Sequence, residues 1–262
     1  MDQLRINSKE TVSSITKFIL TFFHHSSFSH VVLGLSGGID SAVVTALSVQ
    51  ALGSENVFPI LLPYGDLNQK GIEQANALIE TLKIPLSNCA TINIQPFVDP
   101  LIGLDPGMDL LRKGNLMVRV RMIILYDSAK KIHALVAGTE NKTEYLLGYY
   151  TRFGDEASDV EPIRHLYKTQ VYQLAQELRI PESICSAVPT AGLQENQTDE
   201  GDFGFSYKDA DQILALYYDK KFSQEQVAKE GFNKETIEKV LNRSAKNRFK
   251  HETPYTIENF KL

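Results

Sequence analysis

The chain has no tryptophan, only two cysteines and no long hydrophobic run among its 262 residues. The missing tryptophan decides nothing, but Cys89 and Cys185 lack Cys-x-x-Cys spacing, which argues against a disulfide framework or a zinc site. The longest early apolar stretch, residues 18–23, is too short to span a membrane and ends in two histidines rather than a small-residue cleavage site. These absences predict a soluble protein of a reducing compartment, which we expect to be cytoplasmic.

Positive charge is also scarce. Lysine and arginine number 27 against 32 acidic residues, so the net charge is -5 at pH 7. This balance does not favour general nucleic-acid binding, and an anionic ligand would need local clusters of positive charge. The apolar content of 43% is enough for one sizeable core. No linker, repeat or low-complexity tract divides the sequence, so we expect a single domain over 1–262.

Strand and helix patterns alternate through most of the chain. Apolar runs predict strands at 31–35, 57–62, 90–94 and 134–137. Amphipathic patterns predict helices at 8–25, 40–52, 71–83, 116–131 and 168–179, with a loop at 95–112. The alternation predicts the α/β class, with a doubly wound parallel sheet that carries helices on both faces.

The pattern changes after residue 160. Residues 189–206 are polar and lack apolar periodicity, which predicts a mobile loop able to act as a lid. Helical patterns follow at 206–219, 223–230 and 233–250. We therefore expect an α/β core over about 28–190, a lid over about 192–206 and C-terminal helices over about 206–250.

The most informative segment is the strand, turn and helix start at 31–41. A Ser-Gly-Gly turn at 36–38 follows the apolar strand, and the helical pattern begins at Asp40. This arrangement aims backbone N–H groups and the positive end of a helix at one point, which suits a phosphate. Ser36 and Ser41 add hydroxyl donors, and Asp40 can hold a magnesium ion on the phosphate oxygens.

The turn differs from the two commonest phosphate loops. No lysine follows Gly38, as the P-loop requires, and Ser36 stands where the dinucleotide motif has its second glycine. The segment 36–41 instead resembles the S-G-G-x-D-S loop of the ATP pyrophosphatase superfamily. That resemblance implies cleavage of ATP between the α- and β-phosphates and adenylation of a substrate oxygen.

Charged residues of other segments can complete such a site. Arg119 and Arg121 are two apart on one predicted helix and point in different directions, so one can clamp an anionic substrate while the other anchors structure. A carboxylate beyond the strand at 134–137 can be a second magnesium ligand, with Glu144 the candidate and Glu140 its competitor. Composition alone does not choose between these two acids.

Aromatic and basic residues come next along the chain. Tyr149, Tyr150 and Phe153 offer flat faces for a heterocycle, although core packing would explain them equally well. Lys168 opens a predicted helix, a position that the helix dipole disfavours for a cation, so it hints at an anionic partner there.

Taken in order, these motifs resemble those of the ammonia-dependent NAD synthetases. The matching segments are S-G-G-I-D-S at 36–41, N-x-x-x-R-x-R-M at 115–122, G-T-x-N-K-T-E at 138–144, G-Y-Y-T-R-F-G-D at 148–155, K-T-Q-V at 168–171, P-T-A at 189–191 and Q-T-D-E at 197–200. The resemblance implies a Rossmann-like fold of the adenine nucleotide alpha hydrolase type. It also implies a homodimer that binds deamido-NAD near the subunit interface.

The resemblance further implies roles for individual residues. ATP would be contacted by Gly34, Leu35, Ser36, Gly37, Gly38, Ile39, Asp40, Ser41, Thr139, Lys168 and Thr190. Deamido-NAD would be contacted by Arg119, Arg152, Asp159 and Lys250, and magnesium by Asp40 and Glu144. The chain departs from the family pattern at Arg152, often lysine, at Glu156, often a small residue, and at Phe249, which some members replace by histidine.

The implied reaction is the ATP-dependent amidation of deamido-NAD to NAD through an adenylated intermediate, with release of pyrophosphate and AMP. Free ammonia is the expected nitrogen donor, because the first predicted helix begins near residue 8 and leaves no room for a glutamine amidase domain. Two alternatives remain. One is another adenylating enzyme of the superfamily, GMP synthetase-like or tRNA-modifying, and the other is a non-catalytic nucleotide-binding module. The joint presence of Asp40, Glu144 and Lys168 favours catalysis.

Overall fold

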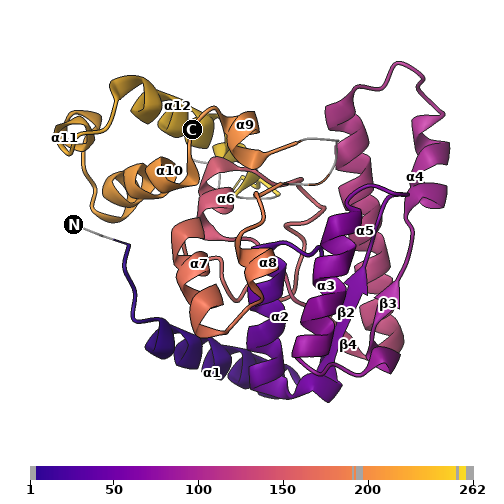
Figure 1. Ribbon diagram of the computed structural model, residues 1–262. Coiled ribbons are helices and arrows are strands. Elements are labelled where there is room, and N and C mark those ends of the chain that lie inside the picture. The colour runs from indigo at the N-terminus through magenta and orange to yellow at the C-terminus, as the bar shows by residue number, and fades with distance from the viewer. Residues whose placement is uncertain (1–3, 191, 193–196, 252–253, 258–262) are drawn as a thin grey trace.

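A parallel sheet of four short strands forms the centre of the computed structural model, which describes residues 4–190, 192, 197–251 and 254–257 (Figure 1). The strands are β1 (His30–Gly34), β2 (Val57–Leu61), β3 (Ala90–Thr91) and β4 (Ala134–Val136). Their order is β3-β2-β1-β4, with every neighbouring pair parallel. The chain thus moves outward from β1 to β3 and then returns to the far side of β1. The carboxyl end of β1 is therefore at a topological switch point, where open α/β sheets bind their ligands.

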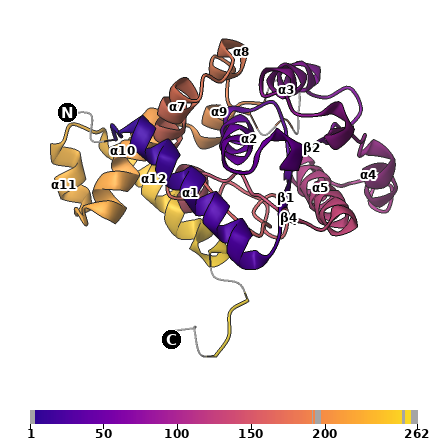
Figure 2. The same ribbon diagram turned by 90° about the horizontal axis from the view of Figure 1, so that it is seen from below.

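Helices cover both faces of the sheet, which confirms the doubly wound fold (Figure 2). One face packs α1 (Ser8–Ser26), α2 (Ile39–Leu52), α3 (Gln69–Thr81) and α7 (Lys168–Glu177), and the other packs α4 (Gln95–Ile102) and α5 (Leu110–Ile132). The alternation of side chains along β1 explains this division. Val31 and Leu33 belong to the core beneath α1 and α2, whereas Val32 belongs to the core beneath α5.

The C-terminal part of the chain is helical and has an apolar core of its own. Its elements are α10 (Tyr207–Leu214), a π-helical turn (Ala215–Asp219), α11 (Gln224–Lys229), α12 (Lys234–Asn247) and a 3-10 turn (Arg248–Lys250). This core also takes in Leu147 from α6 (Lys142–Leu147) and Tyr167 from the residue before α7, so the helical part is joined to the sheet through these two helices.

Three elements differ from the sequence prediction. The loop predicted at 95–112 contains α4, because Pro96 lies in its first turn, where a proline is tolerated, and α5 already begins at Leu110. Asp109 caps α5 by accepting a 2.8 Å hydrogen bond from the Arg112 amide. The strand predicted at 90–94 is reduced to two residues.

The remaining elements are short. They are α8 (Glu182–Cys185), α9 (Asp199–Phe203) and the 3-10 turns Ser54–Asn56 and Leu86–Asn88. The lid predicted over 192–206 lies partly outside the described residues, namely at 193–196, and its described part contains α9. Within the described residues, no helix combines the length and apolarity needed to cross a membrane.

Candidate functional site

A cleft of about 930 Å³ opens at the carboxyl ends of β1 and β4. All residues predicted to contact ATP line it, from Gly34 through Ser41 together with Thr139, Lys168 and Thr190. The predicted metal ligand Glu144 lines it as well. The residues predicted to contact ATP thus come together although they are up to 156 positions apart in the sequence, from Gly34 to Thr190.

The turn after β1 has the geometry of a phosphate cradle. The hydroxyl oxygens of Ser36 and Ser41 are 3.1 Å apart, and the Gly38 amide donates to Ser36 Oγ over 3.2 Å. Gly37 has φ +85°, and a Cβ at that position would lie 2.1 Å from the Gly71 carbonyl oxygen at the start of α3. Only glycine fits this close approach. The turn ends at the N-terminus of α2, whose N–H groups favour an anion.

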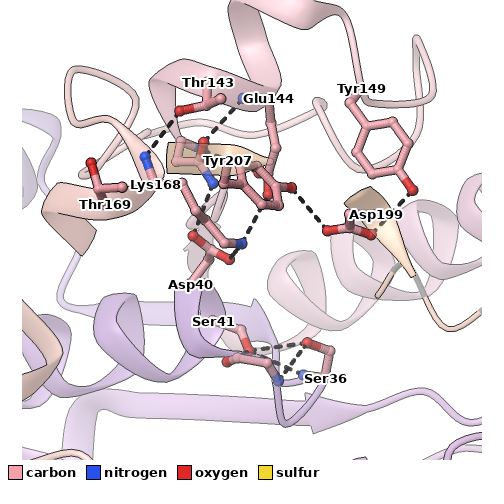
Figure 3. Close-up of polar contacts among 12 residues, drawn as sticks. Ser36, Asp40, Ser41, Thr143, Glu144, Tyr149, Lys168, Thr169, Asp199 and Tyr207 are labelled. Atoms are coloured by element: carbon pink, nitrogen blue, oxygen red, sulfur yellow. Dashed lines mark hydrogen bonds and ion pairs between the residues drawn. The ribbon is translucent and has the colours of Figure 1, made fainter. Parts of the chain in front are cut away.

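Three charged side chains meet beside this turn (Figure 3). Lys168 Nζ lies 2.5 Å from Asp40 Oδ2 and 3.3 Å from Glu144 Oε1, and the Lys168 side chain is only 3% exposed. Each comes from the first turn of a different helix, α2, α6 or α7. Asn141 orients two of them, because its Nδ2 donates to Asp40 over 3.0 Å and its Oδ1 accepts from the Glu144 amide.

Burial controls the ionisation of this cluster. Burial raises the pKa of Glu144 and the nearby Asp40 charge adds to this effect, so the pKa is about 8 despite the opposing effect of Lys168. Burial by itself lowers the pKa of Lys168, but Asp40 and Glu144 together raise it above the ordinary lysine value. The ammonium is therefore firmly charged, and it lies between two acidic side chains.

The donor set fits a magnesium ion that arrives with a nucleotide. No group of three or more histidine, cysteine, aspartate or glutamate side chains is placed to hold a metal among the described residues. Asp40 and Glu144 provide two carboxylates beside the phosphate turn. Mg²⁺ is commonly held by one or two carboxylates, with substrate phosphates and water as the other ligands.

The competing acid, Glu140, faces a different part of the molecule. Its Oε2 lies 2.8 Å from Arg164 Nη2, which is also 3.2 Å from Glu161 Oε1. Burial raises the pKa of Glu140 to about 9 and that of Glu161 to about 7. Glu140 does not line the cleft, so Glu144 is the acid that the fold brings to Asp40.

Helix α9 places Asp199, which is 4% exposed, close enough to Glu144 and Lys168 to affect the pKa of both. Tyr207 donates to Asp199 Oδ2 over 2.9 Å, and the Tyr149 hydroxyl lies 3.1 Å from Asp199 Oδ1 (Figure 3). The same hydroxyl lies 2.8 Å from Asp202 Oδ2. The aromatic segment at 148–155 thus contributes Tyr149 to the cleft lining and to the docking of α9.

The two arginines of α5 do point in different directions, as their spacing predicts. Arg121 lines the cleft and donates to the Leu62 carbonyl over 3.0 Å. Arg119 donates to the Arg152 carbonyl over 3.1 Å, and neither of these residues lines the cleft. Asp159 accepts from the Val136 amide over 2.8 Å and is likewise outside the lining. Contacts of Arg119, Arg152 and Asp159 with deamido-NAD stay predictions.

Lys250 does line the cleft, but its ammonium is engaged by the chain. Nζ donates to the carbonyl oxygens of Gly148 and Tyr150 over 2.6 and 2.8 Å. Its neighbour Phe249 stacks on the Arg152 guanidinium, with 5.5 Å from Cζ to the ring centroid. Two positions that depart from the family pattern therefore contact each other.

Several site residues were missed in the sequence. Asn141 was within a noted motif, and its position three before Glu144 is the signal of a capping box. Asp199 was within the predicted lid, but its contact with Tyr149 spans 50 positions and could not be read from the local pattern. Arg121 was noted, but nothing local showed that it, rather than Arg119, lines the cleft.

Comparison with known proteins points to one family over nearly the whole chain. The NAD synthase family model matches residues 11–254. An NH(3)-dependent NAD(+) synthetase of Fusobacterium nucleatum is 41% identical over 254 residues, which cover 97% of each chain. The solved NH3-dependent NAD synthetase of Campylobacter jejuni, in complex with the nitrate ion, has a TM-score of 0.81 and 33% identity, covering 96% of this chain and 100% of its own. An NMN synthetase of Francisella tularensis also has a TM-score of 0.81, with 32% identity and coverage of 98% and 100%.

Proposed function

We propose, from the premise that this chain belongs to the NAD synthase family, that it is an NH3-dependent NAD⁺ synthetase that converts deamido-NAD to NAD with ATP and free ammonia. The observation that carries the proposal is the meeting of Asp40, Glu144 and Lys168 beside the glycine turn of the cleft. A nucleotide-binding module has no need of two carboxylates and a buried lysine at the phosphates. The alternatives of GMP synthesis and tRNA modification have no support in the family match.

The proposed reaction has two steps. A carboxylate oxygen of the nicotinate group attacks the α-phosphorus of ATP, a P–O bond forms, and pyrophosphate leaves with the electron pair of the broken bond. Ammonia then attacks the carbonyl carbon of the adenylated intermediate. A C–N bond forms, the C–O bond to AMP breaks, and the ammonia loses a proton to give the amide.

The residues of the cleft suit the first step. A carboxylate that approaches a polyphosphate meets like charge, so positive groups must cover the phosphate oxygens. The turn at 36–38 and the N-terminus of α2 supply N–H donors, and Lys168 supplies a full charge. Asp40 and Glu144 would hold Mg²⁺, which as a Lewis acid neutralises charge on the phosphates.

The second step requires that water be kept from the activated carbonyl, because hydrolysis would waste ATP. The described part of the predicted lid supports the proposal of such a cover. Asp199 and Asp202 of α9 line the cleft and are held by Tyr149 and Tyr207. We propose that closure of this lid over bound nucleotide protects the intermediate.

We also propose that the protein works as a homodimer and is cytoplasmic. Support for the dimer comes from apolar side chains left exposed on α4, the following loop and the start of α5. These are Phe97, Leu101, Leu104, Leu110 and Leu111. Leu110 and Leu111 also line the cleft, so a partner seated here would lie beside the bound substrate. Size-exclusion chromatography with light scattering should give twice the chain mass of 29.4 kDa.

The likeness to an NMN synthetase supports a second candidate substrate, the mononucleotide of nicotinate. The amidated group is the same in both reactions, and the substrates differ in the adenylate half that the dinucleotide carries. The curated relative that is 41% identical is an NAD synthetase, so deamido-NAD is our first choice.

The deciding experiment offers both substrates to the purified protein with ATP, Mg²⁺ and ammonium chloride. We expect NAD, AMP and pyrophosphate in equal amounts, and a kcat/KM for deamido-NAD that exceeds the value for the mononucleotide. A higher kcat/KM for the mononucleotide would transfer the assignment to NMN synthesis. Absence of pyrophosphate with either substrate would overturn both.

A further inference from the structure

Asp211 is a fully buried acid that does not line the cleft. It connects the C-terminal helices to the segments that carry Glu144 and Lys168. It lies on α10 and is 0% exposed. Its Oδ1 accepts the Thr143 hydroxyl over 2.5 Å, and its Oδ2 accepts the Thr169 amide over 2.7 Å. The two donors belong to the first turns of α6 and α7. Each donor is the chain neighbour of a cluster residue, since Thr143 precedes Glu144 and Thr169 follows Lys168.

The Thr143 hydroxyl continues this chain of hydrogen bonds. Its single proton goes to Asp211, and its oxygen accepts the backbone amide of Lys168 over 2.9 Å. The carboxylate therefore fixes two successive amides of α7, that of Thr169 directly and that of Lys168 through the hydroxyl. The same hydroxyl ties the first turn of α6 to the first turn of α7.

The charge of Asp211 also offsets an unfavourable electrostatic interaction at the start of α7. Lys168 occupies the first turn of α7, where the helix dipole repels a cation. An anion that accepts N–H groups at this helix end compensates that repulsion. A neutral side chain at position 211 would fill the same space but would not offset the repulsion between the α7 dipole and Lys168.

We propose that Asp211 is a positioning residue for the proposed reaction, which holds α6 and α7 so that Glu144 and Lys168 meet at the phosphates. It touches neither cleft nor ligand, and it acts through the backbone of Lys168 and through Thr143. This inference rests on the proposed function for its purpose, but the contacts that carry it are independent of the substrate.

Substitution at both ends of the contact tests the proposal. Asp211→Asn keeps the shape but places an amide NH₂ against one of the two donors, and Thr143→Val removes the bridging hydroxyl with little change of volume. We expect either change to weaken ATP binding about 10-fold, the equivalent of about 1.4 kcal/mol. Thr143→Ser keeps the hydroxyl and should lose less than a third as much. Asp209→Asn, on the same helix, perturbs a local cap with Ser206 and should leave ATP affinity unchanged.

A double-mutant cycle separates positioning from general stability. ATP dissociation constants are measured by calorimetry, well below the thermal midpoints, for Asp211→Asn in the native background and in a Lys168→Met background. Positioning through Lys168 predicts about a 10-fold loss in the first and less than twofold in the second. Equal losses in both backgrounds would overturn the proposal, because the effect would then not pass through Lys168.

A crystal structure of the Thr143→Val protein gives a second readout that needs neither substrate nor activity. We expect the Lys168 Nζ to Glu144 Oε1 separation to change from 3.3 Å by more than the coordinate error. An unchanged pair would overturn the positioning role. The proposed function stands or falls separately, on the formation of NAD by the native protein.

Discussion

Lys168 Nζ lies 2.5 Å from Asp40 Oδ2, although 128 positions separate the two residues in the sequence. Lys168 is buried, and the same ammonium also serves Glu144. A lysine held between two acids keeps both carboxylates in place before any nucleotide arrives. Substitutions in this cluster should therefore affect both the stability of the protein and its catalytic activity.

Removal of the lysine should destabilise the protein as well as inactivate it. Lys168→Met removes the cation between two acids whose side chains are only 15% exposed. Removing one partner of a buried ion pair typically costs about 3–5 kcal/mol. We expect that loss in the free energy of unfolding measured with urea. Lys239→Met, which breaks an exposed pair with Glu235, should cost less than about 1 kcal/mol. Equal costs would show that the buried cluster has no special role in stability.

The two acids of the segment after β4 should differ sharply in catalysis. Glu144→Gln weakens the magnesium-binding pair with Asp40 and should lower kcat for NAD formation at least about 100-fold. Glu140→Gln changes an acid that lies outside the cleft and should keep kcat within about twofold, since it touches no reacting atom. Steady-state assays of both proteins, with circular dichroism as a check of folding, decide the point. Comparable losses would contradict the assignment of Glu144.

The phosphate turn should not tolerate a methyl group at Gly37. A Cβ there would lie 2.1 Å from the Gly71 carbonyl oxygen, and the backbone has φ +85°. Gly37→Ala must therefore displace either the turn or α3, and we expect ATP binding to weaken more than about 10-fold. Gly103→Ala is the control, because its Cβ would meet its nearest neighbour at 3.5 Å. If Gly37→Ala bound ATP as the native protein does, the turn would not be the phosphate site.

The stability of the protein should depend on pH through Glu140. Burial raises its pKa from 4.5 to about 9, so between these values the folded state holds a proton that the unfolded state has lost. The folded state then binds more protons, and the free energy of unfolding falls as pH rises, by up to about 1.4 kcal/mol per pH unit. Glu140→Gln carries no titrating group and should show a shallower slope between pH 5 and 8. Unfolding in urea across this range measures the difference, and parallel slopes would place the titration elsewhere.

Much of the site could be predicted from sequence because its central parts obey local rules. A strand, a glycine turn and a helix start follow one another at 31–41, and side-chain alternation along β1 decides which core each residue joins. The position of Glu144 in a capping box is also local. The order of the strands agrees with the alternation of strand and helix.

The parts that could not be predicted depend on contacts between distant segments. Asp211 is one of several acids in a helical stretch, and only the packing of α10 against α6 and α7 shows which donors it meets. Helix α4 was missed because three prolines between 96 and 106 indicate a loop, whereas Pro96 lies in the first turn of a helix and Pro100 lies within it. Local patterns describe a residue's surroundings along the chain, but burial is decided by the whole fold.

Helix α9 should protect the adenylated intermediate from water. The Tyr149 hydroxyl carries one proton and lies within hydrogen-bond reach of both Asp202 and Asp199 of that helix. Tyr149→Phe removes this attachment but keeps the ring on Phe203, so α9 should open more often while the cleft stays intact. Water would then reach the activated carbonyl, and AMP should be released in excess of NAD, whereas the native protein should give a ratio near one.

The ratio of AMP to NAD is a sharper measure than the rate, because a general loss of structure lowers both products together. Tyr217→Phe, in the C-terminal helices and outside the cleft lining, serves as the matched control and should keep the ratio of the native protein. Higher ammonium concentrations should restore the ratio in Tyr149→Phe, since ammonia competes with water for the same carbon. A Tyr149→Phe protein that is slower but still forms one NAD for each AMP would mean that this tyrosine does not hold a protective cover, and that water is excluded by other parts of the cleft.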